Sequence, residues 1–202
     1  MARAFRRNGH RFVARLDEVE REVVVGLFRQ THDFIAPVPR EPTGDPFDDL
    51  VARLGMPRIK DMKDLGDPGA DDPHVLEDPA LERLLPSAHR EDPALAAEFR
   101  RLTQHGLREG KAANLATAIS ALLAADGDKV KLDQEQAEAM VVALTDVRLL
   151  LGERLGLQTD EDADALQDRL EAASPDDRQL GLAAYYDFMT WLQESLIQAL
   201  MA

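Results

Sequence analysis

Residues 4–16 read AFRRNGHRFVARL, and this stretch decides the class of fold because it carries the strongest strand signal in the chain. Two short runs flank Asn8-Gly9, the pair preferred in a type I′ turn because both central residues of that turn need a positive φ. A two-residue turn at this place sets Phe5 opposite Phe12 on one face of the hairpin. That aromatic pair predicts a hairpin that packs against helices.

The opposite face of the hairpin would carry like charges, because the same turn sets Arg6 opposite Arg11. Two cations in this arrangement are better solvated than buried. Residues 129–132 read KVKL, and the alternation of Val130 and Leu132 with lysines indicates a short strand that could dock beside the hairpin. The sequence therefore predicts a small N-terminal hairpin, with the option of a three-stranded sheet.

Helices account for the rest of the predicted structure. Apolar residues make up 45% of the chain and few are aromatic, which favours helices because Ala and Leu lose little freedom on entering one. Capping signals mark the helix starts, and the doubled EDPAL at 77–81 and 91–95 is such a signal, since a carboxylate before a proline suits a first turn. The predicted helices lie at about 18–35, 79–85, from 93 onward, 134–155, 160–173 and 175–201.

We expect a mainly α fold, a helical bundle of five or six helices with the hairpin packed at one end. In the first helix, Val19, Val23 and Leu27 are expected to share the buried face. The last helix contains YYDFMTWLQESLIQALM at 185–201, which is apolar around more than half of its circumference and suits the centre of the bundle. Its aromatic residues, which we expect to serve core or dimer packing rather than a ligand site, are Tyr185, Tyr186, Phe188 and Trp191.

The chain is predicted to form a single domain over 1–202. Residues 1–36 hold the hairpin and the first helix, and 77–202 form the helical core. Between them, 37–76 holds seven of the eleven prolines and many acids, a composition typical of a mobile linker. This acidic linker is expected to separate the first helix from the others.

Composition excludes several classes of function. The chain has no cysteine, which excludes a disulfide framework, a thiolate zinc site, an iron–sulfur cluster and a cysteine nucleophile. No apolar run approaches the roughly 20 residues that span a bilayer, and the N-terminal residues lack the apolar stretch of a signal peptide. We therefore expect a cytoplasmic protein.

Catalytic and metal-binding patterns are missing from the sequence. The five histidines never occur as a close pair, so the spacing of helical zinc motifs is not found. The acidic run TDEDADALQD at 159–168 lacks the glycine and the final glutamate of a calcium loop at the required positions, and it suits a solvated helix face. No catalytic residue, cofactor or metal site is predicted, and a carboxylate–metal enzyme assembled from distant helices is kept as the second alternative.

Charge is distributed unevenly along the chain. The net charge is −14, yet residues 1–16 contain five arginines and no acid. Arg6, Arg7 and Arg11 are therefore the first candidate contacts for an acidic protein surface. DNA binding through the same hairpin is the first alternative, although no predicted helix has the basic face of a recognition helix. The further candidate residues, expected to anchor the helices after the linker, are Leu81, Leu84, Leu85 and Phe99.

Three blocks of sequence together resemble a known family. They are MARAFRRNGHRFVARLDEVEREVV at 1–24, DPALERLLPSAHREDPALAAEFRRLT at 78–103 with KAAN at 111–114, and DFMTWLQESLIQALM at 187–201. The blocks are similar to those of an actinobacterial family long described as a domain of unknown function. Genes of that family lie beside the gene for the ClpS protease adaptor, and the family includes the actinomycete oxidative-stress regulators.

The resemblance implies a non-enzymatic cytoplasmic regulator that acts on transcription or the stress response through protein–protein contact. A sigma factor is the implied partner, and the resemblance points to no cofactor and no membrane association. Redox sensing in those regulators rests on cysteines, so their disulfide switch is not carried over to a chain without cysteine. We expect the regulator to act as a homodimer.

Overall fold

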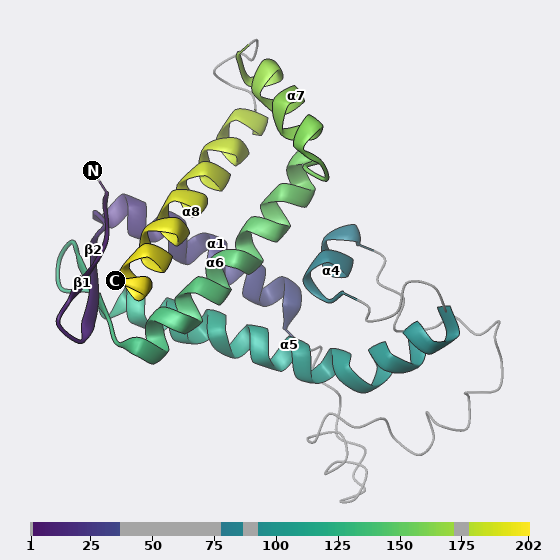
Figure 1. Ribbon diagram of the computed structural model, residues 1–202, viewed down its shortest axis with the longest axis horizontal. Coiled ribbons are helices and arrows are strands. Elements are labelled where there is room, and N and C mark those ends of the chain that lie inside the picture. The colour runs from purple at the N-terminus through teal and green to yellow at the C-terminus, as the bar shows by residue number, and fades with distance from the viewer. Residues whose placement is uncertain (1, 37–77, 87–92, 172–177) are drawn as a thin grey trace, which may run out of the picture. The chain divides into compact units, whose positions relative to one another are not determined.

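The computed structural model describes residues 2–36, 78–86, 93–171 and 178–202 (Figure 1). The described elements are β1 (Arg3–Asn8), β2 (Arg11–Arg15), α1 (Glu18–Ile35), α4 (Pro79–Leu84), α5 (Pro93–Leu123), β3 (Lys129–Leu132), α6 (Gln134–Leu155), α7 (Asp160–Glu171) and α8 (Arg178–Met201). The predicted fold class is confirmed, because the described chain is mainly helical with an N-terminal three-stranded sheet.

The sheet is antiparallel, and its strands lie in the order β1-β2-β3. The predicted third strand is confirmed. Phe12 of β2 pairs with Leu132 of β3, and Ala14 pairs with Val130. All four side chains are buried, so these pairs form the apolar inner face of the sheet.

The hairpin turn lies one residue later than predicted. Gly9 and His10 occupy the turn, and Asn8 pairs with Arg11. Gly9 has a φ of 62°, whereas none of the other residue types among the described ones has a positive φ. This is the pattern of a type II′ turn, which needs a positive φ only at its first central residue, while the predicted type I′ turn would have required one at Asn8 as well.

The predicted cross-strand pairs are wrong for the same reason. Phe12 lies opposite Arg7, and Val13 lies opposite Arg6. Phe5 and Phe12 are nevertheless both buried, because alternation of side chains keeps them on one face. The prediction that the hairpin has one apolar face and one charged face is confirmed. The predicted pairs of opposite residues are wrong.

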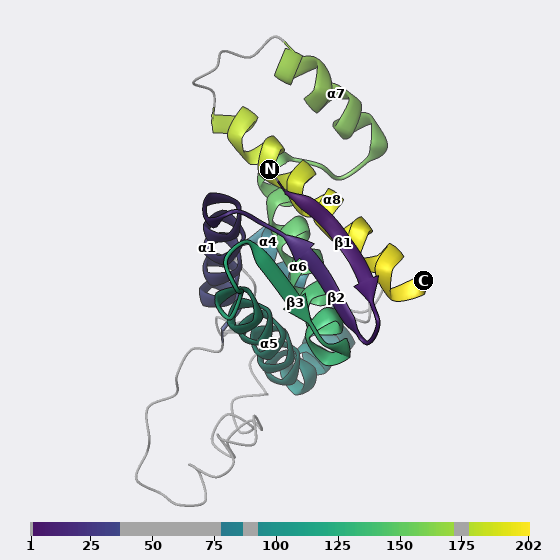
Figure 2. The same cartoon turned by 90° about the vertical axis from the view of Figure 1, so that its left-hand side faces the viewer.

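Helices α6 and α8 cover the inner face of the sheet, and Figure 2 looks onto the outer face. α8 packs along the edge strand β1, and the backbone N–H of Phe5 donates a buried hydrogen bond of 3.1 Å to Ser195 Oγ. This bond satisfies a backbone donor that would otherwise be unpaired at the sheet edge. It also fixes β1 against α8.

Helix α6 is enclosed more fully than α8. It begins with the predicted capping box of Asp133 and Gln136, ends at Gly156 with a φ of 75°, and buries residues around more than half of its circumference. On α8, by contrast, Tyr185 and Trp191 are 39% and 37% exposed. The expectation that other elements pack on several sides of the last helix is met in part, because α8 packs on α6, β1 and β2 but leaves these two aromatic side chains more than one third exposed.

Helix α1 begins with its predicted capping box but buries a different face. The N–H of Glu20 donates to the Asp17 carboxylate at 3.0 Å, and the N–H of Asp17 donates to the Glu20 carboxylate at 2.9 Å. Val19 is 70% exposed, whereas Val24 and Phe28 are fully buried. Three consecutive valines at 23–25 give the sequence no single apolar face, so packing against α6 decides which side is buried.

The chain divides into two compact units, Met1–Ile35 with Lys111–Ala202 and Ala36–Gly110. In the second unit, α4 begins as predicted, with the Asp78 carboxylate accepting a 2.9 Å hydrogen bond from the N–H of Ala80. The predicted linker over 37–76 and the predicted helix start at 174–175 lie outside the described residues, and the single domain stays a prediction. None of the described helices combines the length and the apolar character needed to cross a membrane.

Candidate functional site

Cations cover the outer face of the sheet. Phe12 and Ala14 point inward, so the residues that alternate with them on β2 point outward. Pairing extends this outer face to both neighbouring strands, since Arg6 lies opposite Val13 and Arg3 lies opposite Arg15. The cations on this surface, which we call the basic face, are Arg3, Arg6, Arg11, Arg15, Lys129 and Lys131.

Acidic side chains balance only part of this charge. Arg11 pairs with Asp133 at 3.4 Å, and Arg15 pairs with Asp128 at 3.1 Å. These four side chains are about half exposed, so each pair stabilises the fold by at most about 1 kcal/mol. In the described part of the chain, the basic-face cations with no carboxylate within 4.0 Å are Arg3, Arg6 and Lys129.

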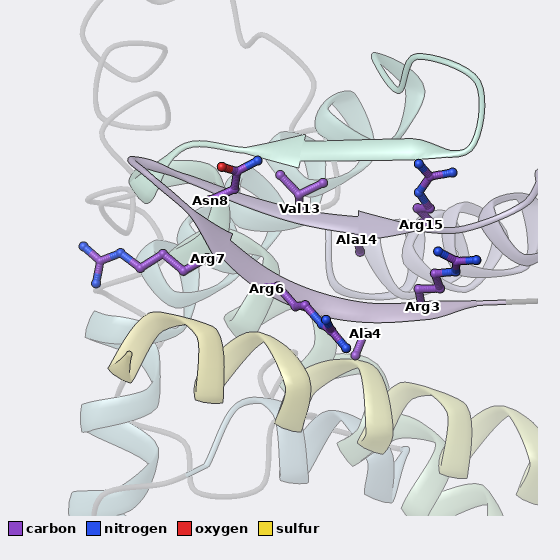
Figure 3. A pocket seen from close by; sticks show the side chains of 8 residues that line it. All are labelled: Arg3, Ala4, Arg6, Arg7, Asn8, Val13, Ala14 and Arg15. Atoms are coloured by element: carbon purple, nitrogen blue, oxygen red, sulfur yellow. The ribbon is translucent and has the colours of Figure 1, made fainter.

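A shallow depression of about 640 Å³ opens in the basic face (Figure 3). Its charged lining consists of Arg3, Arg6 and Arg15 of the basic face together with Arg7 at the end of β1, and Val13 lies among them. Arg3 and Arg15 project side by side from neighbouring strands in Figure 3, as their cross-strand pairing requires. The depression is a concave, positively charged surface with an apolar residue inside it, which suits an anionic group.

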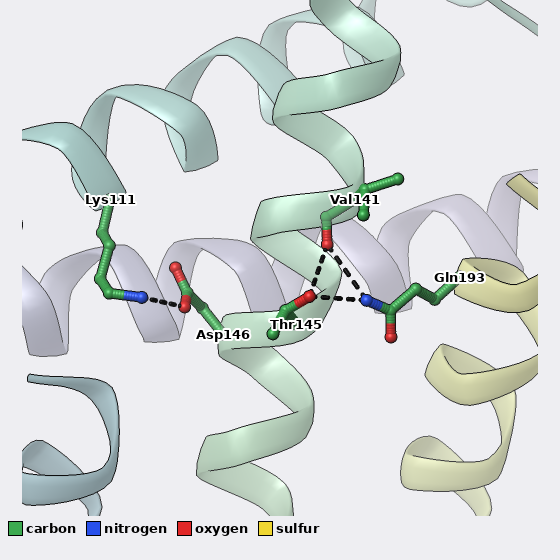
Figure 4. A network of polar contacts seen from close by, with 5 residues as sticks. All are labelled: Lys111, Val141, Thr145, Asp146 and Gln193. Carbon is green, nitrogen blue, oxygen red and sulfur yellow. Dashed lines mark hydrogen bonds and ion pairs between the residues drawn. The ribbon is translucent and has the colours of Figure 1, made fainter. Parts of the chain in front are cut away.

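Polar side chains also hold α5 and α8 against α6 in the interior (Figure 4). The Lys111 ammonium of α5 donates to Asp146 Oδ1 of α6. From α8, the Gln193 amide donates to Thr145 Oγ1 at 2.6 Å and to the Val141 carbonyl at 3.3 Å. These bonds satisfy buried polar groups and thereby fix the order of the helices.

The carboxylate of Asp146 is fully buried. Burial raises the pKa of Asp146, and the Lys111 ammonium acts in the opposite direction through its hydrogen bond and charge. Oδ2 of Asp146 has no hydrogen-bond partner among the residues described. Because Lys111 is the compensating charge, the pair is a structural contact between α5 and α6 rather than a site open to ligands.

An aromatic pair lies on the exposed side of α8. The rings of Phe188 and Trp191 stack with their centroids 5.9 Å apart and their planes 16° apart. Tyr185 and Trp191 are more than one third exposed, so the predicted core packing is wrong for these two residues, and dimer packing stays a prediction. Tyr186 differs, because its ring lies 5.4 Å from the guanidinium carbon of Arg148.

Metal-binding residues do not gather in the parts of the chain that the structure covers. No group of three or more His, Asp or Glu side chains there could hold a metal ion. The depression in the basic face is lined by arginines and contains no carboxylate. The carboxylate–metal alternative gains no support from these residues and stays a prediction.

Comparison with protein families identifies the family of this chain. A family model described as a domain of unknown function (DUF2017) matches residues 2–200. The chain belongs to the DUF2017 family. The resemblance to a family described as a domain of unknown function is thereby confirmed. No curated protein and no solved structure matches this DUF2017 chain, so its function is argued from its own residues.

The predicted arginines of this DUF2017 protein do not all lie on one surface. Arg6 and Arg11 lie on the basic face, at its β1 and β2 strands. Arg7 lies opposite Phe12 and so belongs to the other side of the hairpin, although its side chain is exposed at the end of the strand. Its Nε donates a long hydrogen bond of 3.4 Å to the Gly9 carbonyl.

The predicted leucines belong to the second unit. Leu84 and Leu85 are buried, and Leu81 is partly buried. This burial favours the predicted anchoring role over direct contact with a partner, and a partner-binding role stays a prediction. Phe99 lies in α5, but its side chain is outside the described set.

Sequence reasoning missed several cations of the basic face. The sequence pattern indicates the charge of Arg3 and Arg15 and the strand position of Lys129 and Lys131, but it does not join these four residues into one surface. The signal that could have found them is period-two alternation across all three predicted strands, because every second residue of KVKL is a lysine. Only the register joins these lysines to the arginines of the hairpin.

Proposed function

We propose that this DUF2017 protein is a non-enzymatic regulatory protein that binds an acidic protein partner through the basic face. The observation that carries the proposal is the depression bordered by Arg3, Arg6 and Arg15. Arg3 lies directly opposite Arg15, although like charges in this position destabilise a sheet. Such an arrangement is expected where exposed cations meet an anionic partner.

Carboxylates of a protein surface fit this face better than a long anionic polymer does. The net charge of −14 repels a phosphate backbone beyond the immediate contact. Arginine guanidinium groups can bind carboxylates through two parallel hydrogen bonds. The strand that carries Arg3 and Arg6 is fixed by the bond from Phe5 to Ser195, so binding loses little conformational freedom.

In the biological role that we propose, contact with the partner regulates transcription or a stress response. This role follows the resemblance to the actinobacterial family encoded beside the ClpS adaptor, and it makes a sigma factor the candidate partner. The protein would act in the cytoplasm, as a homodimer and without a cofactor. Sensing in this chain would not use a disulfide, because the chain has no cysteine.

Affinity capture from native cells tests the proposal. The full chain serves as bait beside its Arg6→Glu variant and an Arg29→Glu variant, which makes the same charge change at an exposed position of α1. We expect one acidic protein to be recovered by the wild type and by Arg29→Glu, and to be lost with Arg6→Glu. Equal recovery by all three baits, or recovery of no specific protein, would contradict the proposal.

DNA binding is the second candidate, because the basic face is built on a hairpin. This alternative predicts an affinity for duplex DNA that falls steeply with salt and is lost on charge reversal of Arg6 and Arg11. A gel-shift titration at low salt measures it directly. Absence of a shifted band at low salt would remove the alternative, whereas a salt-sensitive band lost with these variants would replace the preferred proposal.

A further inference from the structure

The exposed side of α8 carries an apolar stripe. Leu180, Ala184, Phe188 and Trp191 follow one another at intervals of three or four residues, which places them along one side of the helix. Leu180 and Trp191 are 36% and 37% exposed, and the stack between Phe188 and Trp191 holds two of the side chains in place. A stripe of this spacing fits the apolar side of a second helix.

This stripe borders the basic face at the edge strand β1. Ser195 accepts the hydrogen bond from Phe5, and Trp191 lies one helical turn before Ser195 on the same side of α8. β1 and α8 run next to each other in the same direction (Figure 2). One turn of α8 rises about 5.4 Å, so Trp191 is displaced by about that distance from the Ser195 contact towards the Arg3 end of β1.

The charges on the two sides of the stripe have opposite signs. Seen along α8, at about 100° for each residue, Ser195 and the cations of β1 lie to one side of Trp191. Asp187 and Glu194 lie to the other side, and both are exposed. On the β1 side, Arg3 and Arg6 have no carboxylate within 4.0 Å in the described ranges. The composite surface is therefore apolar in the middle, positive towards the sheet and negative away from it.

We infer that the stripe and the basic face together bind an acidic amphipathic helix of the partner protein. Its apolar side chains cover Phe188 and Trp191, and its carboxylates meet Arg3 and Arg6. Asp187 and Glu194 fix its orientation, because they repel carboxylates on the far side. The inference rests on the proposed function and specifies the form of the partner.

Trp191 is the only tryptophan of the chain, so its fluorescence reports on this surface alone. The full chain is titrated with a tryptophan-free synthetic peptide that forms an amphipathic helix with glutamates along one side and leucines along the other. One control peptide has the glutamates replaced by glutamines, and another has the same composition in a scrambled order. We expect a blue shift of the Trp191 emission and binding at least about tenfold tighter than with either control.

Variants locate the bound peptide. Arg3→Glu and Phe188→Ser should each weaken binding about tenfold or more, whereas Arg29→Glu should leave the affinity unchanged. Circular dichroism and thermal unfolding verify that each variant is folded, and Leu180→Ser repeats the test at the other end of the stripe. Arg3→Glu alters a charge of the basic face, whereas Phe188→Ser and Leu180→Ser alter the apolar stripe. Weaker peptide binding in all three variants would support one continuous surface.

Three outcomes would overturn the inference. Equal binding of the amphipathic and scrambled peptides, without a change in Trp191 emission, would leave an acidic partner on the basic face but not a helix on α8. Failure of every acidic peptide to bind at low salt would overturn the proposed function as well. Self-association of the chain in sedimentation velocity, lost with Trp191→Ser, would show that a second copy covers the stripe instead.

Discussion

The basic face and the interior of α6 both hold ion pairs, but their surroundings are opposite. Arg15 and Asp128 are about half exposed on the sheet, whereas Asp146 is buried against Lys111. Water screens the first pair and supplies other partners if it breaks, but it cannot reach the buried carboxylate. The comparison teaches that the sheet charges are nearly dispensable for the fold and therefore available for binding, while the interior charge depends on its partner.

The largest effect is expected from Lys111→Met, which breaks the interior pair. The substitution leaves Asp146 buried without its compensating charge and should lower the free energy of unfolding by about 3 kcal/mol. Urea unfolding of the full chain measures this. The matched control is Lys131→Met on the basic face, whose partner Asp126 is 4.0 Å away and exposed, and which should change stability by less than about 0.5 kcal/mol. Equal losses of stability in the two variants would contradict the view that the buried ion pair matters more to the fold than the exposed one.

The pH dependence of the Lys111→Met variant sharpens the same contrast. The pKa of Asp146 is already raised by burial, and loss of Lys111 raises it further. Above pH 3.8, the ordinary pKa of an aspartate, Asp146 of the variant then holds its proton more often in the folded state than in the unfolded state. Protonation of Asp146 therefore stabilises the fold at low pH, and this stabilisation is lost as pH rises. The difference in free energy of unfolding between the wild type and the Lys111→Met variant should therefore shrink as pH is lowered from neutral towards 3.8. A difference that stays constant with pH would show that Asp146 is not the cause.

A smaller effect is expected from Ser195→Ala, which removes the hydrogen bond between the edge strand β1 and helix α8. The backbone N–H of Phe5 loses its acceptor in a buried place, so unfolding should become easier by about 1 to 2 kcal/mol. Amide exchange of the β1 residues should accelerate more than that of α6. Ser120→Ala is the control, because the exposed Ser120 hydroxyl donates only to a carbonyl of its own helix. Unchanged exchange in β1 would show that Ser195 does not fix the edge strand.

The smallest effect on stability is expected from Arg15→Gln. Its pair with Asp128 is solvated, so the free energy of unfolding should change by less than about 1 kcal/mol, while recovery of the acidic partner should fall. Thermal unfolding and affinity capture are measured on the same preparation. A large loss of stability would show that the basic face serves the fold rather than a partner.

Local signals predicted much of the fold. Three helix starts could be predicted because each depends on residues within one helical turn. They are the capping boxes at Asp17 and Asp133 and the start of α4 after Asp78. The strand at 129–132 was readable because two buried residues alternate with two lysines. Such features need no knowledge of distant contacts.

The errors lie where a choice depends on packing. Asn8-Gly9 is a good type I′ pair, but the sheet register uses Gly9 alone with a positive φ and shifts the turn by one residue. Val23 and Val24 are equally apolar, and only the position of α6 decides that Val24 is buried. The basic face was found only in part for the same reason, since pairing with β3 adds lysines that are far from the hairpin in sequence.

The most direct test of the account maps the binding surface by amide NMR on the full, isotopically labelled chain. The acidic amphipathic peptide is added stepwise, and the shift of each backbone amide is followed. We predict that the largest shifts occur at Arg3, Arg6, Val13 and Arg15, with a second group around Trp191, and that α1 remains unchanged around Arg29. Largest shifts on α1 or α7 with an unperturbed sheet would contradict the claim that the basic face is the contact surface.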